Sequence, residues 1–260
     1  MSILRVAIDI PLPRLFDYTS DDASPQDIGR CVRVPFGSGA KLGVIVAVTG
    51  SSEQSPDKLK PAGEILRGMP ALPSDWLALT EFCSRYYQHP LGEVMALALP
   101  PYLRRGKLPA KRNTRKPKPL PETAPAAGSG VPGVPSVPSV PSVPELHPEQ
   151  AVAVAAVAAG FGRYAAFLLH GITGSGKTEV YLRLIEQTLA QGRQALMLVP
   201  EIALTPQLEG RVAARFPDAR VVSAHSGMGD AARARDFLAA LDGRADIVLG
   251  TRLAVFTPLP

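Results

Sequence analysis

The chain has 260 residues, a net charge of +5 and a hydrophobic content of 46%, which is enough for two globular domains of ordinary size. No run approaches the roughly 20 apolar residues of a membrane-spanning helix, and the first residues lack a charged-then-apolar export signal. We therefore expect a cytoplasmic protein that does not bind membranes.

The two cysteines, Cys31 and Cys83, have no C-x-x-C spacing, so neither a zinc site nor a disulfide framework is indicated. We expect both to be small, buried, apolar side chains.

The first 50 residues carry the signals of β-strands. Residues 4–10, 31–36 and 42–48 are short alternating or β-branched runs bounded by turn residues, and residues 37–40 suit a hairpin turn. These patterns predict a small all-β or barrel-like module.

Phe16, Asp17 and Tyr18 are expected in a loop between these strands. Exposed aromatic rings beside a carboxylate suit stacking on a base and accepting hydrogen bonds from a sugar or a base edge. Ordinary partial burial of the two rings is an equally good interpretation of the sequence.

Residues 72–98 follow a helical pattern, which His89-Pro90 breaks before a second short helix. Apolar residues at steps of three and four predict a stripe that faces the core rather than a ligand. The stripe consists of Trp76, Leu79, Phe82 and Tyr86.

A basic, proline-containing segment with no acidic residue follows between Tyr102 and Leu120. Its cations are Arg104, Arg105, Lys107, Lys111, Arg112, Arg115, Lys116 and Lys118. Such a run is either an arm that neutralises nucleic-acid phosphates or a solubilising linker. Residues 131–144 then repeat Val-Pro-Ser, and proline at every third place predicts an extended spacer.

Residues 171–178, GITGSGKT, fill every fixed position of the phosphate-binding pattern G-x-x-x-x-G-K-[ST]. The apolar run 164–170 predicts a buried strand before the loop, and residues 179–191 predict a helix after it, with Gly192 as its terminator. Strand, glycine-rich turn and helix is the context in which this motif holds a nucleotide.

The residue types explain the chemistry of this loop. Gly174 and Gly176 allow the backbone to form a nest of N–H groups for phosphate oxygens. Lys177 brings an ammonium to the β- and γ-phosphates, and Thr178 supplies a hydroxyl to Mg²⁺.

An alanine-rich stretch at 148–159 predicts a helix before the loop. Three further strands are predicted at 194–199, 220–223 and 246–249, each followed by a polar motif. Alternating strands and helices indicate an α/β domain with a parallel sheet whose ligand loops lie at the carboxyl ends of the strands.

Stretches from both halves of the chain carry a resemblance. They are PLPRLFDY, CVRVPFGSGAKLGVIV, YYQHPLGEV, GITGSGKTEVYL, LVPEIALTPQ, HSG and GTRLAVFTP. On them the chain resembles the primosomal protein N′ (PriA) family of bacterial replication-restart DNA helicases.

The resemblance implies a multidomain protein. Residues 1–103 would form a β-rich domain, helical at its end, that binds 3′ ends of DNA. Residues 104–145 would be a linker, and residues 146–260 the first RecA-like helicase lobe.

By the same resemblance, ATP and Mg²⁺ would be the cofactors, with Lys177 and Thr178 in the catalytic site. The ATP-binding residues would be Gln150, for the adenine, and Gly171, Ile172, Thr173, Gly174, Ser175, Gly176, Lys177 and Thr178. The DNA-binding residues would be Phe16, Asp17, Tyr18, Gly37, Lys60, Pro200, Glu201, Thr205, Gly250, Thr251 and Arg252. Partners would be forked and single-stranded DNA, primosome proteins and single-strand-binding proteins.

The chain departs from the family pattern in two ways. The basic and Val-Pro-Ser segments stand where the family places a winged-helix domain. The acidic Mg²⁺-binding motif, the arginine finger and the zinc cysteines of the family would lie beyond Pro260. We therefore expect the front portion of a longer enzyme, one that binds ATP but hydrolyses it negligibly by itself.

Three functions remain open from the sequence. The first is an ATP-dependent DNA helicase, with 3′-to-5′ polarity implied by the resemblance, that restarts replication at stalled forks. The second is a fork-binding or 3′-end-binding module without catalysis. The third, a small-molecule kinase, shares the phosphate-binding loop but leaves the N-terminal module unexplained.

Overall fold

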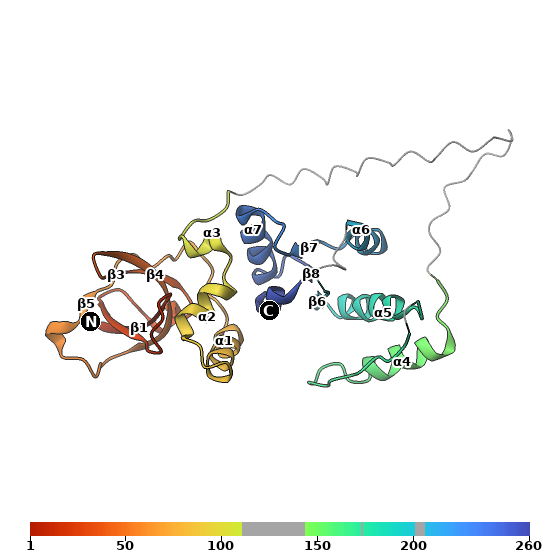
Figure 1. Ribbon diagram of the computed structural model, residues 1–260, viewed down its shortest axis with the longest axis horizontal. Coiled ribbons are helices and arrows are strands. Elements are labelled where there is room, and N and C mark those ends of the chain that lie inside the picture. The colour runs from red at the N-terminus through yellow and green to blue at the C-terminus, as the bar shows by residue number, and fades with distance from the viewer. Residues whose placement is uncertain (111–143, 173, 201–205) are drawn as a thin grey trace. The chain divides into compact units, whose positions relative to one another are not determined.

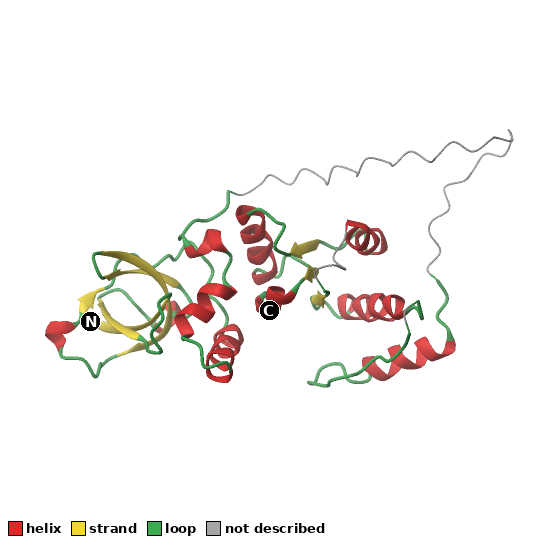
Figure 2. Ribbon diagram, viewed as in Figure 1, coloured by secondary structure: helices red, strands yellow, loops and turns green. Residues whose placement is uncertain are grey.

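The computed structural model describes residues 1–110, 144–172, 174–200 and 206–260. These residues form two compact units, Met1–Pro109 with Ile185–Pro260, and Ala110–Leu184. Figure 1 traces the chain, and Figure 2 marks its helices and strands. In the described ranges, no helix has the length and apolar character needed to cross a membrane.

The N-terminal part of the first unit is built on a five-stranded sheet of order β3-β4-β1-β2-β5. Neighbouring strands are antiparallel, except that the short β5 pairs in parallel with β2. The three strands predicted in the first 50 residues are confirmed. The strands are β1 (Ser2–Ile8), β2 (Phe16–Ser20), β3 (Cys31–Phe36), β4 (Gly39–Thr49) and β5 (Lys60–Pro61).

The prediction of a loop at residues 16–18 is wrong, because these residues begin strand β2. Tyr18 faces the core and is buried, and its hydroxyl donates a hydrogen bond to the Pro35 carbonyl at 3.1 Å. Burial raises the pKa of this phenol. The strand escaped detection because it has only five residues and its alternation is masked by polar neighbours.

The predicted hairpin turn is confirmed between β3 and β4, where Phe36 pairs with Gly39 across two turn residues. Gly37 has φ +60, a left-handed conformation that favours glycine at the first position of such a turn. Two single-turn helices, η1 (Pro25–Asp27) and η2 (Pro56–Lys58), lie in the other connections.

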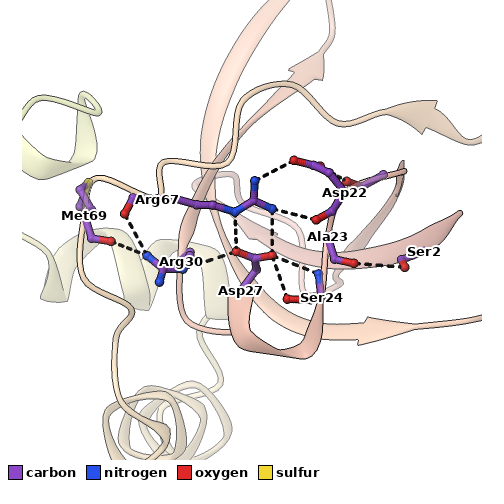
Figure 3. Close-up of polar contacts among 9 residues, drawn as sticks. Ser2, Asp22, Ala23, Ser24, Asp27, Arg30, Arg67 and Met69 are labelled. Carbon is purple, nitrogen blue, oxygen red and sulfur yellow. Dashed lines mark hydrogen bonds and ion pairs between the residues drawn. The ribbon is translucent and has the colours of Figure 1, made fainter.

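A buried carboxylate joins two connections of this sheet (Figure 3). Asp27, only 3% exposed, accepts hydrogen bonds from Arg67 at 3.0 and 3.1 Å and from the Ser24 amide at 3.0 Å. Arg67 also donates to Asp22 at 2.7 Å, and Arg30 donates to the Met69 carbonyl at 2.8 Å. The network therefore fastens residues 62–73 to the segment that carries η1.

The same network makes folding stability dependent on pH. The hydrogen bonds from Arg67 lower the pKa of the Asp27 carboxyl below its ordinary value. The stabilisation is therefore complete above the unfolded pKa of about 3.9 and is lost as the pH falls through the lower folded pKa. We expect Asp27→Asn to lower the free energy of unfolding by about 2 kcal/mol at neutral pH. Below about pH 4 this gap in unfolding free energy between the variant and the unmodified protein should narrow.

Urea unfolding at several pH values, followed by tryptophan fluorescence, measures this gap. Asp57→Asn, which changes an exposed carboxylate on η2, is the matched control and should have little effect. A gap that stays constant down to acidic pH would contradict the assignment.

Helices follow the sheet, as the sequence predicts: α1 (Ser74–Tyr86), α2 (Leu91–Ala98) and the short α3 (Pro101–Arg104). Helix α2 packs against β1 at Gly92, where a Cβ atom would lie 1.8 Å from the Ile8 carbonyl oxygen. Any other residue at this position would push the helix off the strand. Cys31 is buried as predicted, and burial raises the pKa of its thiol to about 12.

The predicted core-facing stripe on α1 is correct only for its first half. Trp76 is buried and Leu79 is partly buried against the core, but Phe82 and Tyr86 are exposed. Each step of three residues turns the position back by about 60° around a helix, so two such steps move it about 120° away. The exposed rings stack on each other instead, with centroids 5.5 Å apart.

The C-terminal part of the first unit is an α/β layer with the predicted parallel sheet, in the order β6-β8-β7. All three predicted strands are confirmed. The elements are β6 (Ala195–Leu198), α6 (Pro206–Arg215), β7 (Val221–Ala224), α7 (Asp230–Leu241), β8 (Ile247–Gly250) and η4 (Arg252–Phe256).

The two parts of this unit share one hydrophobic core. Phe237 on α7 and Phe256 on η4 belong to the same buried cluster as Trp76 and Met95. Inside it, the Trp76 indole N–H donates to the Phe256 carbonyl at 2.8 Å. At the edge of this core, Arg105 forms an ion pair with Asp230 on α7 at 3.3 Å, so one cation of the basic segment is engaged by a carboxylate of the chain itself. Residues 111–118 of that segment lie outside the described ranges.

Trp76→Phe tests this junction, because it removes the indole donor and leaves a buried carbonyl without that hydrogen bond. We expect the free energy of unfolding to fall by about 1 to 3 kcal/mol. Urea unfolding followed by far-UV circular dichroism measures it. Phe82→Leu on the exposed face of α1 should change stability by less than about 0.5 kcal/mol; equal losses in the two variants would refute the role of the junction.

The second unit contains α4 (Pro148–Ala158) and the first half of α5 (Lys177–Ala190), and both helices agree with the prediction. Gly192, just past α5, has φ +69 and ends the helix as predicted. The strand predicted at 164–170 is absent: these residues form no ladder within the described chain, and Tyr164 and Leu168 are more than 90% exposed. A parallel strand depends on hydrogen bonds from neighbouring strands, which an apolar run cannot supply by itself.

Candidate functional sites

The five residues that the resemblance assigns to a DNA-end pocket all line one surface pocket of about 640 Å³. Phe16, Asp17 and Tyr18 come from β2, Gly37 from the β3–β4 turn and Lys60 from β5. The parallel pairing of β2 with β5 sets Tyr18 opposite Lys60 and so brings the lysine to the pocket.

Asp17 is held in place by two neighbours. Arg5 lies directly opposite it on β1, with its Nε 3.6 Å from Oδ1 of the carboxylate. The Ser52 hydroxyl donates to Oδ2 at 2.5 Å. The side chain of Asp17 is only 10% exposed, so this carboxylate lies on a strand and is largely shielded from solvent. Each oxygen of an ionised carboxylate has two acceptor sites, so both retain a site for a ligand.

The aromatic wall of the pocket is ordered by contacts that sequence reasoning missed. The Phe36 ring packs edge-on against Phe16, with centroids 5.4 Å apart at 88°. The Arg14 guanidinium carbon lies 4.8 Å from the centroid of the Phe16 ring. The available signals were weak: Arg14 precedes the FDY sequence and Phe36 precedes the turn glycine, but no local pattern brings the two segments together.

The pocket is predominantly cationic. Its lining includes Arg5, Arg14, Lys58 and Lys60 against two carboxylates, Asp17 and Glu53. Because Asp17 already pairs with Arg5, the excess positive charge favours an anionic ligand such as a nucleotide.

The phosphate-binding loop has the glycine conformations and the following helix that its sequence predicts. Gly174 and Gly176 have φ +85 and +79, and α5 begins at Lys177. A Cβ atom at Gly176 would also lie 2.3 Å from the Gln150 side-chain nitrogen, so this side chain would have to shift. Thr173 lies outside the described residues.

Two side chains of this site bind the loop itself. The Lys177 ammonium donates to the carbonyls of Gly171 and Ile172 at 2.6 and 2.7 Å. The Gln150 amide nitrogen donates to the Ser175 carbonyl at 3.2 Å, and its oxygen accepts from the His147 amide at 2.9 Å. Lys177 must therefore leave two carbonyls to reach a phosphate.

The donors present fit a nucleotide phosphate. Left-handed glycines and a helix N-terminus form the kind of backbone nest that binds anions. Gly174, Gly176, Lys177 and Thr178 would hold the phosphates and one side of the Mg²⁺. Among the described residues, no group of three or more His, Cys, Asp or Glu side chains is placed to hold a metal ion.

The three parallel strands end together at one edge of the sheet. Leu198 and Ala224 both pair with Gly250, so the three strands end at one level. Pro200 and Arg252 are exposed at this edge, whereas Gly250 and Thr251 are buried. Arg252 is thus the exposed member of the predicted GTR contact; Glu201 and Thr205 fall outside the described ranges.

Comparison with known proteins agrees with this arrangement. Residues 5–100 match the family model described as 3′DNA-binding domain, and residues 147–259 match that of the DEAD/DEAH box helicases. The replication restart protein PriA of Haemophilus influenzae is 31% identical over an alignment that covers 99% of this chain and 42% of that protein.

The chain belongs to the PriA family. PriA of Treponema pallidum is 29% identical over 98% of this chain and 36% of its own length, and PriA of Synechocystis is 50% identical over 37% of this chain and 12% of its own. The chain thus spans less than half the length of these PriA proteins, and it corresponds to their N-terminal portion.

Lys177→Ala tests the loop of this PriA-family chain. Removal of the ammonium should weaken Mg-ATP binding by about tenfold or more, because a charge-assisted contact to phosphate is lost. Isothermal titration calorimetry measures the affinity. Arg193→Ala removes a cation just past the far end of α5 and should leave the affinity unchanged; an unaltered affinity in Lys177→Ala would show that the loop does not hold the phosphates.

Proposed function

We propose that this chain is the fork-recognising part of an ATP-dependent DNA helicase that restarts replication. Residues 1–103 bind the 3′ end of a nascent strand, residues 104–145 act as a linker, and residues 146–260 form the first helicase lobe. Its unwinding activity and its primosome partners depend on the whole enzyme.

One observation carries this proposal above the others. Phe16, Asp17, Tyr18, Gly37 and Lys60 come from three separate segments and line one cationic pocket within the region that matches the 3′DNA-binding domain. A ring for stacking, a carboxylate for a hydroxyl and cations for phosphates are what a terminal nucleotide requires.

The helicase lobe has the parts for ATP and for a DNA strand. Lys177, Thr178 and the glycines of the loop would hold Mg-ATP, whose hydrolysis supplies the energy for unwinding. Pro200 and Arg252, exposed at the carboxyl edge of the sheet, would contact the DNA backbone. The basic residues near Arg104 would add further phosphate contacts.

A second function, a DNA-end-binding module without catalysis, is favoured by one observation. The Lys177 ammonium binds the carbonyls of its own loop, so it is not positioned in advance for a phosphate. The rate of DNA-stimulated ATP hydrolysis by the whole enzyme decides between the two, because this chain by itself is expected to hydrolyse ATP negligibly in either case. Hydrolysis by the whole enzyme that Lys177→Ala abolishes would favour the helicase, and its absence there would favour the binding module.

The central prediction is a preference for DNA ends with a free 3′-hydroxyl, mediated by Asp17. An ionised carboxylate accepts a hydrogen bond from a hydroxyl, whereas a 3′-phosphate would bring like charge against it. Asp17→Asn should therefore reduce the preference for 3′-hydroxyl over 3′-phosphate ends. Fluorescence anisotropy with labelled forks of both end types measures it.

Two controls accompany this experiment. Glu53→Gln changes the other carboxylate of the pocket and should keep the preference. Because Asp17 pairs with Arg5 across the sheet, the unfolding midpoint of Asp17→Asn is measured alongside its affinity. Equal affinity of the unmodified chain for the two end types would disprove the end-binding function.

A further inference from the structure

Arg14 lines the proposed DNA-end pocket but has no role in the site described above. Its side chain is exposed, lines the pocket and lies over the Phe16 ring, with the guanidinium carbon 4.8 Å from the ring centroid. A guanidinium stacked on an aromatic ring keeps its N–H donors free at the edge of its plane.

The backbone before Arg14 holds this residue rigidly. Three successive tight turns, each closed by a hydrogen bond to the carbonyl two residues back, involve the amides of Ile10, Leu12 and Arg14 at 2.8 to 2.9 Å. Pro11 and Pro13 stand between these residues and fix their own φ angles. Little backbone entropy is left to lose when a ligand binds here.

The ring beneath Arg14 is fixed as well. Phe16 lies on β2 and is supported edge-on by Phe36. The guanidinium and the ring therefore form one preorganised surface on the lining of the pocket.

The other cations of the pocket are placed differently. Arg5 is engaged with Asp17, and Lys58 and Lys60 are flexible point charges. No hydrogen bond or ion pair engages the Arg14 side chain in the described part of the chain. Its planar fork of donors suits the two oxygens of a phosphate, which a lysine cannot match.

We propose that Arg14 binds the 5′-phosphate of the terminal nucleotide, so that the pocket recognises one nucleotide with both its phosphate and its sugar hydroxyl. This inference rests on the proposed end-binding function. Asp17 accepts from the 3′-hydroxyl, the Phe16 surface stacks with the base, and Arg14 clamps the phosphate on the 5′ side. The pocket then measures one complete nucleotide, from its 5′-phosphate to its free 3′-hydroxyl.

Three small ligands test this proposal on the intact chain: thymidine, thymidine 5′-monophosphate and thymidine 3′-monophosphate. The unmodified chain should bind the 5′-monophosphate at least about tenfold more tightly than thymidine, as expected for a charge-assisted bidentate contact. Arg14→Gln should abolish this gain. Arg14→Lys, which keeps the charge but loses the fork, should retain only part of it.

The design separates phosphate binding from mere support of the Phe16 ring. If Arg14 only supports the ring, Arg14→Gln will weaken thymidine and its 5′-monophosphate equally and leave their ratio unchanged, which overturns the proposal. Lys58→Gln is the matched control on the same pocket. Loss of the gain in Lys58→Gln but not in Arg14→Gln would assign the phosphate to Lys58 and also overturn it.

A salt titration with single-stranded oligonucleotides gives an independent measure. Removal of one phosphate contact should flatten the slope of log affinity against log salt by about 0.7 in Arg14→Gln, and an unchanged slope would count against the contact. The 3′-monophosphate separates the two hypotheses. If it binds as well as the 5′-monophosphate, the end-binding function itself fails; if it binds worse but Arg14→Gln keeps the 5′-phosphate gain, only the role of Arg14 fails.

Discussion

The hydrogen bond from Trp76 to the Phe256 carbonyl is the contact through which the two parts of the first unit become one structure. It is buried, it joins residues 180 positions apart, and the groups around it form one core. Phe256 ends η4, which starts at Arg252 directly after the GTR motif. Helix α1, which carries Trp76, therefore supports η4, the segment that begins with the proposed DNA contact Arg252.

The end pocket depends on strand register in a similar way. Pairing of β1 with β2 sets Arg5 opposite Asp17, and pairing of β2 with β5 brings Lys60 beside Tyr18. A slip of one residue would turn Tyr18 out of the core and Asp17 into it. Burial of Tyr18 thus fixes the direction in which the carboxylate of Asp17 points.

Local patterns predicted the elements whose signals lie within their own residues. Strands β1, β3 and β4, the hairpin glycine and the parallel strands were readable, because alternation, turn chemistry and apolar runs are local properties. The gathering of Phe16, Gly37 and Lys60 was anticipated only through the family resemblance. Arg14 and Phe36 were missed, because no spacing shows that β2 and the β3–β4 turn meet.

Two of the errors concern features that depend on partners distant in sequence. The run 164–170 is apolar enough for a buried strand, but a strand exists only where neighbours supply its hydrogen bonds. Phe82 and Tyr86 are spaced as a stripe, but the packing of α1 decides which rings are covered. The phosphate-binding loop is the instructive contrast: left-handed glycines shape its backbone locally. The position of the Lys177 ammonium depends instead on which oxygens are nearest, and those are the carbonyls of the loop. Backbone shape is therefore encoded within this motif, whereas the engagement of its lysine with phosphate has to be driven by the ligand.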